Sequence, residues 1–340
     1  MKIAIHNENT GFHPRWINYC QQKGIPYKLV NVYDFDIIHN LEDCDILMWH
    51  HKHYDYRDVL YSKQLLFSLE QAGKKVFPDF NTTWHFDDKV GQKYLLEAIH
   101  APIVPSYVFY SKKEALSWID QTQFPKVFKL RGGAGSTNVS LVKSRQRAKK
   151  IVKKAFGKGI KTFQWRKSII ELWRKYKEKQ ISVFDFVKYL VVNTFIRGNY
   201  QKLQPRAFGY AYFQDFIPNN KFDIRVCVVD GKAFGIKRMC RDNDFRASGS
   251  GHLIYDKAQI DVRCVKIALE TSIKLKAQSI AYDFVFDGEN NPLIVEISYG
   301  YSVSAYDKCE GYWDDDMNWH EGDHFDFCGW MVESVLRDLD

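Results

Sequence analysis

Over the first 80 residues, short apolar runs alternate with stretches in which apolar residues recur every three or four positions. The runs predict strands, and the spaced stretches predict amphipathic helices. In chain order we expect a strand at Lys2–His6, a helix at Pro14–Lys23, strands at Tyr27–Val32 and Asp45–Trp49, a helix at Arg57–Gln71 and a strand at Lys75–Phe77. This alternation predicts a small parallel α/β domain at residues 1–84.

Beyond residue 84, helices and strand pairs replace the simple alternation, as in an α+β fold. We expect one lobe at residues 85–217, interrupted by a helical insertion at 144–200, and a second lobe at 218–340. The elements expected there are helices at Asp87–Ala98, Lys112–Asp120, Arg145–Phe156, Trp165–Tyr176, Val183–Ile196, Ile260–Lys274 and Phe325–Leu339, a strand at Ala211–Ile217, and strand pairs within Phe124–Val142, Phe222–Lys237 and Ile280–Ile297.

The last strand pair carries one acid in each apolar run. Asp283 and Glu296 lie on either side of the turn-rich segment 287–292, as expected for a hairpin. A carboxylate buried among apolar residues is unfavourable unless a cation or hydrogen bonds compensate it. Two such acids on adjacent strands predict either a Mg²⁺ site beside phosphate oxygens or two strand acids neutralised by Lys or Arg.

A glycine-rich segment joins the two strands predicted within Phe124–Val142. The first strand ends at Lys129, and the segment then supplies Gly132, Gly133, Gly135, Ser136 and Thr137. Glycines let backbone N–H groups turn toward an anion, and the hydroxyl groups add donors. The segment matches neither the P-loop pattern nor the dinucleotide-binding pattern. It therefore predicts either a flap over phosphates or a simple turn.

Four arginines cluster in and after the strand pair at Phe222–Lys237, namely Arg225, Arg238, Arg241 and Arg246. Guanidinium groups that reach a site from strand ends and from a Gly/Ser loop suit the recognition of phosphate or carboxylate. The alternative is a set of exposed surface arginines.

The net charge of +8 is concentrated in one segment. Lys143–Lys179 contains 15 Lys or Arg residues and two Glu, a balance of +13, so the rest of the chain is acidic overall. Charge runs of this kind are usually solvated faces of packed helices. The alternative is a surface for a negatively charged acceptor, nucleic acid or an anionic membrane.

The cysteines and the apolar runs indicate the compartment. The seven cysteines are odd in number, widely spread and free of C-x-x-C pairs, which argues against a disulfide framework or a zinc ribbon. No apolar run reaches the roughly 18 residues of a membrane span, and the N-terminus does not resemble a secretory signal. We expect a cytoplasmic protein without a transmembrane segment.

Two histidine segments are further candidates for chemistry. His50, His51 and His53 lie in a predicted loop, where solvated histidines are the first expectation and ligands for a substrate or metal are the alternative. Residues 320–324 match the zinc-peptidase pattern H-E-x-x-H, which requires one continuous helix. Because Gly322 and the preceding residues disfavour a helix, a zinc site is not expected there.

Taken together and in this order, these segments resemble the ATP-grasp superfamily of ATP-dependent carboxylate–amine ligases, especially the ribosomal-protein glutamate ligases and bacterial glutathione synthetases. The resemblance covers about residues 85–300. It is carried by Asp88–Lys89, FPKVFKLRGGAGSTNV, FQDFI, FDIRVCVVDGK, DNDFRASGSG and YDFVF…PLIVEIS. It implies an N-terminal pre-ATP-grasp α/β domain followed by an ATP-grasp fold, here with an unusually long helical insertion.

The resemblance also implies roles for individual residues. ATP phosphates would be held by Lys89, Lys129 and the segment Gly132–Thr137, the adenine edge by Asp215 and Phe216, and the ribose by Asp223. Arg225, Arg238 and Arg246 would be catalytic, and Arg238 and Arg246 would hold the transferred phosphate and the acyl-phosphate. Asp283, Glu296 and Ser298 would bind Mg²⁺, with Mn²⁺ as an alternative. Ser298 stands where the family usually has Asn, and its side chain is shorter.

The implied reaction is the formation of an amide or peptide bond through an acyl-phosphate. The partners would be a small carboxylate and an amine, for example an amino acid joined to a sugar, a peptide or a cell-surface glycan precursor. The charge segregation, and not the resemblance, suggests that the basic insertion holds a negatively charged or lipid-linked acceptor at the inner face of the membrane. We also expect a homo-oligomer. Nucleic acid is the less favoured partner. The rival hypothesis is a nucleotide-regulated binding protein whose insertion docks on nucleic acid or an anionic membrane.

Overall fold

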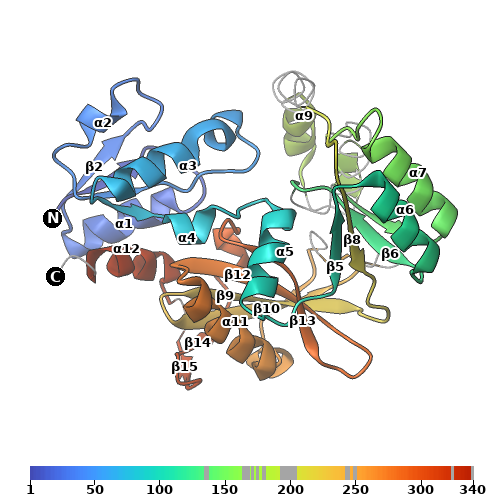
Figure 1. Ribbon diagram of the computed structural model, residues 1–340. Coiled ribbons are helices and arrows are strands. Elements are labelled where there is room, and N and C mark those ends of the chain that lie inside the picture. Colours follow the sequence, from blue (N-terminus) through green and yellow to red (C-terminus); the bar gives the residue numbers. More distant parts are fainter. Residues whose placement is uncertain are drawn as a thin grey trace.

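The structure is a computed structural model that describes residues 1–133, 138–162, 169, 172–173, 176–177, 181–191, 205–241, 246–247, 251–322 and 325–337. Figure 1 shows a parallel N-terminal sheet at the left, a four-stranded sheet with its helices at the right, and a larger antiparallel sheet below and between them. None of the helices in these ranges is long and apolar enough to span a membrane.

The N-terminal sheet has the order β2-β1-β3-β4, and all pairs are parallel. Its strands are β1 (Ile3–His6), β2 (Tyr27–Val30), β3 (Ile46–Met48) and β4 (Lys75–Phe77), and its helices are α1 (His13–Lys23), α2 (Ile37–Asn40) and α3 (Tyr56–Gln71). Successive residues of β1 face opposite sides, so Ile3 and Ile5 join the core under α1 whereas Ala4 joins the core under α3. The parallel α/β prediction is confirmed.

The C-terminal helix α12 (Phe327–Arg337) packs beside α1 at the base of this sheet (Figure 1). Tyr19 of α1 donates a hydrogen bond to Glu333 of α12. Gly329 allows the close approach, because a Cβ there would lie 2.5 Å from the Tyr19 ring. The end of the chain therefore stabilises its beginning.

The four-stranded sheet has the order β5-β8-β6-β7 and is antiparallel throughout. It contains β5 (Ser106–Phe109), β6 (Lys126–Lys129), β7 (Val139–Val142) and β8 (Ala211–Asp215), with α6 (Lys112–Gln121) and α7 (Arg145–Ala155) on one face and α9 (Val183–Val191) nearby. Phe128 and Phe213 point into the core under α6 and α7. The other face of β6 and β8 is free to line a cleft.

The large sheet has the order β13-β12-β9-β10-β14-β15, with β11 (Leu253–Ile254) also paired to β10. Its other strands are β9 (Phe222–Val229), β10 (Lys232–Met239), β12 (Ser279–Phe286), β13 (Pro292–Ser298), β14 (Gly311–Trp313) and β15 (Trp319–Glu321). One face packs on α5 (Lys89–Ala98) and α11 (Val262–Leu275). The turn between β9 and β10 uses Asp230 at φ 49° and Gly231 at φ 74°, the left-handed pair that favours tight hairpins.

The long predicted elements are present within one to three residues of their expected ends. Strands β14 and β15 are absent from the sequence prediction, because three-residue strands in a tail rich in Asp and Gly give too short a pattern to recognise. Most of the helix expected at Trp165–Tyr176, and the end of the one expected at Val183–Ile196, lie outside the described residues. Short helices α4 (Phe80–Thr83), η2 (Lys257–Gln259) and η3 (Val303–Ala305) complete the fold.

Candidate functional site

The free face of the four-stranded sheet meets strand β13 of the large sheet. Lys129 lies opposite Tyr212, and Ser106 lies opposite Gln214, so these four side chains share that face. A space of only about 10 Å³ separates Tyr212 and Gln214 from Glu296. The site therefore forms where two sheets close on each other.

The two predicted acids are direct neighbours across the hairpin. Asp283 of β12 pairs in register with Glu296 of β13, and a bulge follows immediately. Residues directly opposite in an antiparallel pair point to the same face. Ser298 lies two positions after Glu296 and therefore also faces this side; its hydroxyl donates to the Gly300 carbonyl at 3.1 Å. The predicted hairpin and its two facing acids are confirmed.

A network of four buried or partly buried charges continues from Asp283 along the large sheet. Arg225 binds both Asp283 oxygens at 2.5 and 2.7 Å, and Arg238 approaches the same carboxylate at 2.9 Å. Arg238 also binds both oxygens of Asp223, at 2.6 and 2.5 Å. The alternative expectation, that these arginines are exposed on the surface, is therefore wrong for Arg225 and Arg238.

The pKa values within this network follow from the number of arginines that each acid contacts. Burial acts to raise the pKa of Asp283, but two guanidinium groups outweigh it, so the pKa lies well below its usual value. Burial raises the pKa of Asp223, because Arg238 alone does not compensate for it. Asp283 is therefore the more strongly ionised carboxylate.

Lys89 connects Glu296 to the glycine-rich loop. It is 3% exposed, and its Nζ lies 3.0 Å from Glu296 Oε1 and 2.9 Å from the Gly133 carbonyl. Burial acts to lower the pKa of Lys89, but Glu296 and Asp87 reverse the effect and raise it. Lys89 sits at the start of α5 because Asp88 caps that helix, accepting from the Gly91 N–H at 3.0 Å.

Lys129 has a different environment from Lys89. It is 4% exposed, and no acceptor in the described part of the chain lies within hydrogen-bond distance of its ammonium group. Burial lowers its pKa to about 8, although Glu296 partly opposes this. A buried ammonium without a hydrogen-bond partner is strongly unfavourable unless an anion joins it.

Gly133, at the start of the glycine-rich loop, contacts Asp87, which the sequence analysis did not identify as a site residue. The Gly133 N–H donates to both oxygens of Asp87, at 2.8 and 3.0 Å, and Asn138 donates to the Gly132 carbonyl at 3.0 Å. Gly133 has φ 118°, and a Cβ there would lie 2.5 Å from the Asn138 amide nitrogen. Glycine is therefore required at this position. Gly135, Ser136 and Thr137 lie outside the described residues.

The remaining predicted site residues are not all brought to this cleft. Asp215 lies on the opposite face of β8 from Gln214, and its carboxylate binds Lys126 at 2.5 Å. Phe216 follows directly at the end of that strand. Arg246 is half-buried, but residues 242–245 and 248–250 of its loop lie outside the described residues. Tyr212 and Gln214 occupy the cleft face instead, and the alternation within AYFQD could have revealed them.

A larger cavity of about 550 Å³ lies beside this site. It is bounded by the loops after β1 and β3 and by residues 300–304 after β13. His50 and His51 line it and are almost fully buried, so the expectation of solvated histidines is wrong for both. Burial lowers the pKa of His50 well below its usual value and that of His51 to about 3, so both rings are neutral.

The zinc-peptidase pattern does not form its helix. His320 and Glu321 belong to strand β15, where the His320 ring stacks on Tyr312 and binds Asp314 at 2.7 Å. Residues 323–324 lie outside the described residues. Across the ranges that are described, no three His, Cys, Asp or Glu side chains are grouped to hold a metal ion.

Comparison with known proteins identifies the fold. Residues 193–312 match the family model described as a RimK-like ATP-grasp domain. This part of the chain is similar to RimK-like ATP-grasp domains. The matched segment includes the hairpin with Asp283 and Glu296, and the resemblance seen in the sequence is confirmed. A search of curated proteins finds no match.

Solved ATP-grasp structures superimpose over almost the whole chain. A RimK domain ATP-grasp protein from Sphaerobacter thermophilus DSM 20745 has 13% identity and a TM-score of 0.58, covering 99% of this chain and 100% of its own. The D-alanine–D-alanine ligase from Bacillus anthracis complexed with ATP has 12% identity and a TM-score of 0.58, covering 99% and 97%. The ATP-grasp ligase PsnB, complexed with precursor peptide PsnA2 and AMPPNP, has 10% identity and a TM-score of 0.54, covering 98% and 97%. At these identities the likeness shows a shared fold and not a shared activity.

Proposed function

We propose that this protein is a Mg²⁺- and ATP-dependent carboxylate–amine ligase. The observation that carries the proposal is Lys129, a buried ammonium that has no hydrogen-bond acceptor in the described part of the chain. It stands at the end of the strand that leads into the glycine-rich loop and interacts electrostatically with Glu296. A triphosphate is an anion that would satisfy the Lys129 ammonium. Lys89 contacts both the Gly133 carbonyl of the glycine-rich loop and the Glu296 carboxylate. Its ammonium group would therefore also be placed to bind the phosphates.

In the structure Arg225 and Arg238 neutralise Asp283 and Lys89 neutralises Glu296, as the alternative expected, and the two acids would also suit a hard divalent cation. Asp283 and Glu296 face the same side from paired strands, and oxygen ligands of this kind are those that Mg²⁺ prefers. Asp283, Glu296 and Ser298 would hold Mg²⁺ or Mn²⁺, and the metal would supply positive charge that neutralises the phosphates. The Ser298 hydroxyl is a shorter ligand than the Asn usual in the family, so we propose one well-held metal position and a weaker second one.

The rest of the chemistry follows from the charged residues. An acid substrate would attack the terminal phosphorus of ATP, releasing ADP and forming an acyl-phosphate, and an amine would then displace phosphate. Lys89, Lys129 and Arg238 would stabilise the charge on the transferred group, so catalysis rests on positioning and electrostatics. Arg225 would act by holding Asp283 rather than by touching the phosphate, because both of its bonds go to that carboxylate.

The test is ADP release from ATP, with amino acids and carboxylates supplied pairwise. We expect acceptor-dependent, Mg²⁺-dependent turnover that falls at least 1,000-fold in Glu296→Gln, because this change removes a metal ligand and the partner of Lys89 (about 4 kcal/mol of lost stabilisation). Glu289→Gln, in the exposed hairpin loop, is the matched control and should keep full activity. Unchanged turnover in Glu296→Gln would refute the metal assignment.

A second candidate role concerns the basic insertion. The exposed residues of α9 include Val183, Phe184 and Val187, with Phe184 77% exposed, and α7 of the same lobe presents exposed basic residues such as Lys150 and Lys153. An apolar helix stripe and basic residues in the same lobe suit the surface of an anionic membrane. We propose that this surface brings the enzyme to a lipid-linked or otherwise anionic acceptor at the membrane.

This second role predicts sedimentation with vesicles that contain 30% phosphatidylglycerol, weakened at least several-fold by Phe184→Ser or by 0.5 M salt. Vesicles of phosphatidylcholine alone should not bind. Ile273→Ser, which removes an exposed apolar side chain from α11 in the other lobe, is the control. Binding that is equal for both vesicle types, or unchanged in Phe184→Ser, would contradict this role.

A further inference from the structure

The cavity of about 550 Å³ begins where the proposed nucleotide site ends. Gly300 is part of its lining and lies two residues after Ser298 on the chain. A cavity of this size accommodates a ligand of the size of an amino acid or a sugar. Because the cavity adjoins the proposed nucleotide site, it could hold the portion of a substrate that lies away from the reacting carboxylate.

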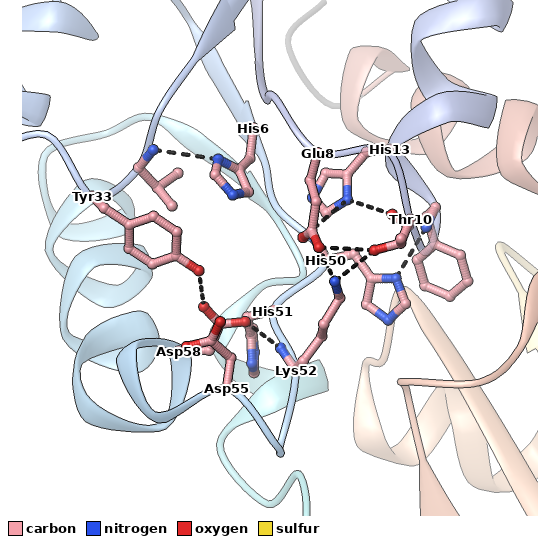
Figure 2. A network of polar contacts seen from close by, with 12 residues as sticks. His6, Glu8, Thr10, His13, Tyr33, His50, His51, Lys52, Asp55 and Asp58 are labelled. Carbon is pink, nitrogen blue, oxygen red and sulfur yellow. Dashed lines mark hydrogen bonds and ion pairs between the residues drawn. The ribbon is translucent and has the colours of Figure 1, made fainter. Parts of the chain in front are cut away.

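One ring nitrogen of His50 is an unused donor in the cavity wall. His50 is 7% exposed, and its Nδ1 accepts a hydrogen bond from the Phe12 backbone N–H at 3.0 Å (Figure 2). A nitrogen that accepts carries no proton, so the proton of the neutral ring is on Nε2. Nε2 points away from that amide and lies near Gly300, and no acceptor for it is present in the described part of the chain.

The surrounding residues fix this tautomer and the position of the ring. His13 donates from Nδ1 to the Thr10 carbonyl at 2.9 Å and accepts from the His50 backbone N–H at 3.0 Å. The His50 ring packs directly on Gly11, where a Cβ would lie 2.3 Å from Nδ1. Lys52 binds Thr10 Oγ1 at 2.6 Å and also the carboxylate of Glu8 (Figure 2).

The two cations in the cavity wall are each paired with a carboxylate that lies outside the lining: Arg15 with Asp307 and Lys52 with Glu8. The lining includes these cations and the hydroxyl groups of Ser302 and Ser304, and it includes no carboxylate. An ammonium group would find no carboxylate in this wall, whereas an anion would find the His50 N–H donor and the hydroxyl donors.

We propose that this cavity binds an anionic group of the substrate, a carboxylate or a phosphate, and that His50 Nε2 is a donor that selects it. The inference rests on the proposed ligase function and narrows its substrate to a compound that carries negative charge away from the reacting group. His50 is thus a specificity-determining residue, and its role is separate from phosphate transfer.

The test compares probes of similar size and different charge by calorimetry on the full chain with Mg²⁺ and AMPPNP. The probes are L-glutamate, L-glutamine and L-lysine for a carboxylate, and glycerol 3-phosphate against glycerol for a phosphate. We expect the anionic member of at least one set to bind at least tenfold more tightly than its neutral or cationic relatives. The set that shows this difference identifies the carboxylate or the phosphate as the recognised group.

The variant His50→Asn isolates the donor, because the Asn side-chain oxygen can still accept from the Phe12 N–H while the Nε2 donor is lost. We expect roughly 10- to 100-fold weaker binding of the anionic probe, with the Tm and the AMPPNP affinity unchanged. His39→Asn, at an exposed histidine of α2, is the control. If His50→Asn lowers the Tm, Ser304→Asp, which adds a negative charge at the exposed rim, provides the same test and should weaken the anion equally.

The outcomes separate the two proposals. If AMPPNP does not bind, the proposed ligase function fails. If AMPPNP binds but the anionic probes bind no better than their relatives, or His50→Asn and Ser304→Asp leave their affinity unchanged, only the anionic-substrate inference is overturned.

Discussion

Replacing Lys129 by methionine should abolish ATP binding while making the nucleotide-free protein more stable. Methionine fills a similar volume without burying a charge, so it removes the desolvation penalty that now lowers the Lys129 pKa to about 8. We expect a gain of roughly 1–3 kcal/mol in the free energy of unfolding, together with a loss of at least 100-fold in ATP affinity.

Chemical denaturation and calorimetric titration of ATP measure the two effects of Lys129→Met. Lys113→Met, on the exposed face of α6, is the control and should change neither. In the wild type the folded pKa of about 8 lies below the ordinary value of 10.5, so the folded state binds fewer protons between these limits. Stability should therefore rise with pH from about 8 towards 10.5, and ATP binding near pH 8 should take up protons. A destabilised Lys129→Met protein that still binds ATP would contradict this account.

The second large effect is expected at Asp283, and it concerns the fold as well as the chemistry. Asp283→Asn leaves Arg225 without its ionised partner and leaves Arg238 with Asp223 alone. Removing one member of a buried ion pair typically costs about 3–5 kcal/mol, because the remaining charge is uncompensated. Thermal and urea unfolding should show a loss of this size.

Asp316→Asn, in an exposed turn, is the control for that measurement and should change the free energy of unfolding by less than about 0.5 kcal/mol. Glu296→Gln should destabilise the fold less than Asp283→Asn, because Lys89 retains the Gly133 carbonyl and the nearby Asp87. A loss below about 1 kcal/mol in Asp283→Asn would show that the arginine pair does not depend on this carboxylate.

The sequence predicts those parts of the site that depend on local pattern. A two-residue period and a turn-rich loop place Asp283 and Glu296 on facing strands, and the structure confirms it. The same reasoning identifies Lys129 at the end of its strand. It does not show that Arg225 lies opposite Asp283, because this needs the order of strands β9 and β12 in the sheet.

The features that the sequence does not predict depend on contacts between distant segments. Asp87 meets Gly133 only when α5 and the glycine-rich loop come together. The sequence predicts that His50 is a loop histidine. In the structure Phe12 and Gly300, which are distant in the chain, pack against its ring. Burial of a loop residue is a property of the tertiary fold, so no periodicity in its own segment could have indicated it.

Calorimetric titration of the wild-type protein with AMPPNP, with and without Mg²⁺, tests the central claim most directly. The claim is that Lys89 and Lys129 hold a triphosphate whose Mg²⁺ is held by Asp283 and Glu296. We predict one binding event per chain that is at least tenfold tighter with Mg²⁺ than with EDTA. The absence of any binding heat at saturating nucleotide and Mg²⁺, over a range of temperatures, would contradict the account.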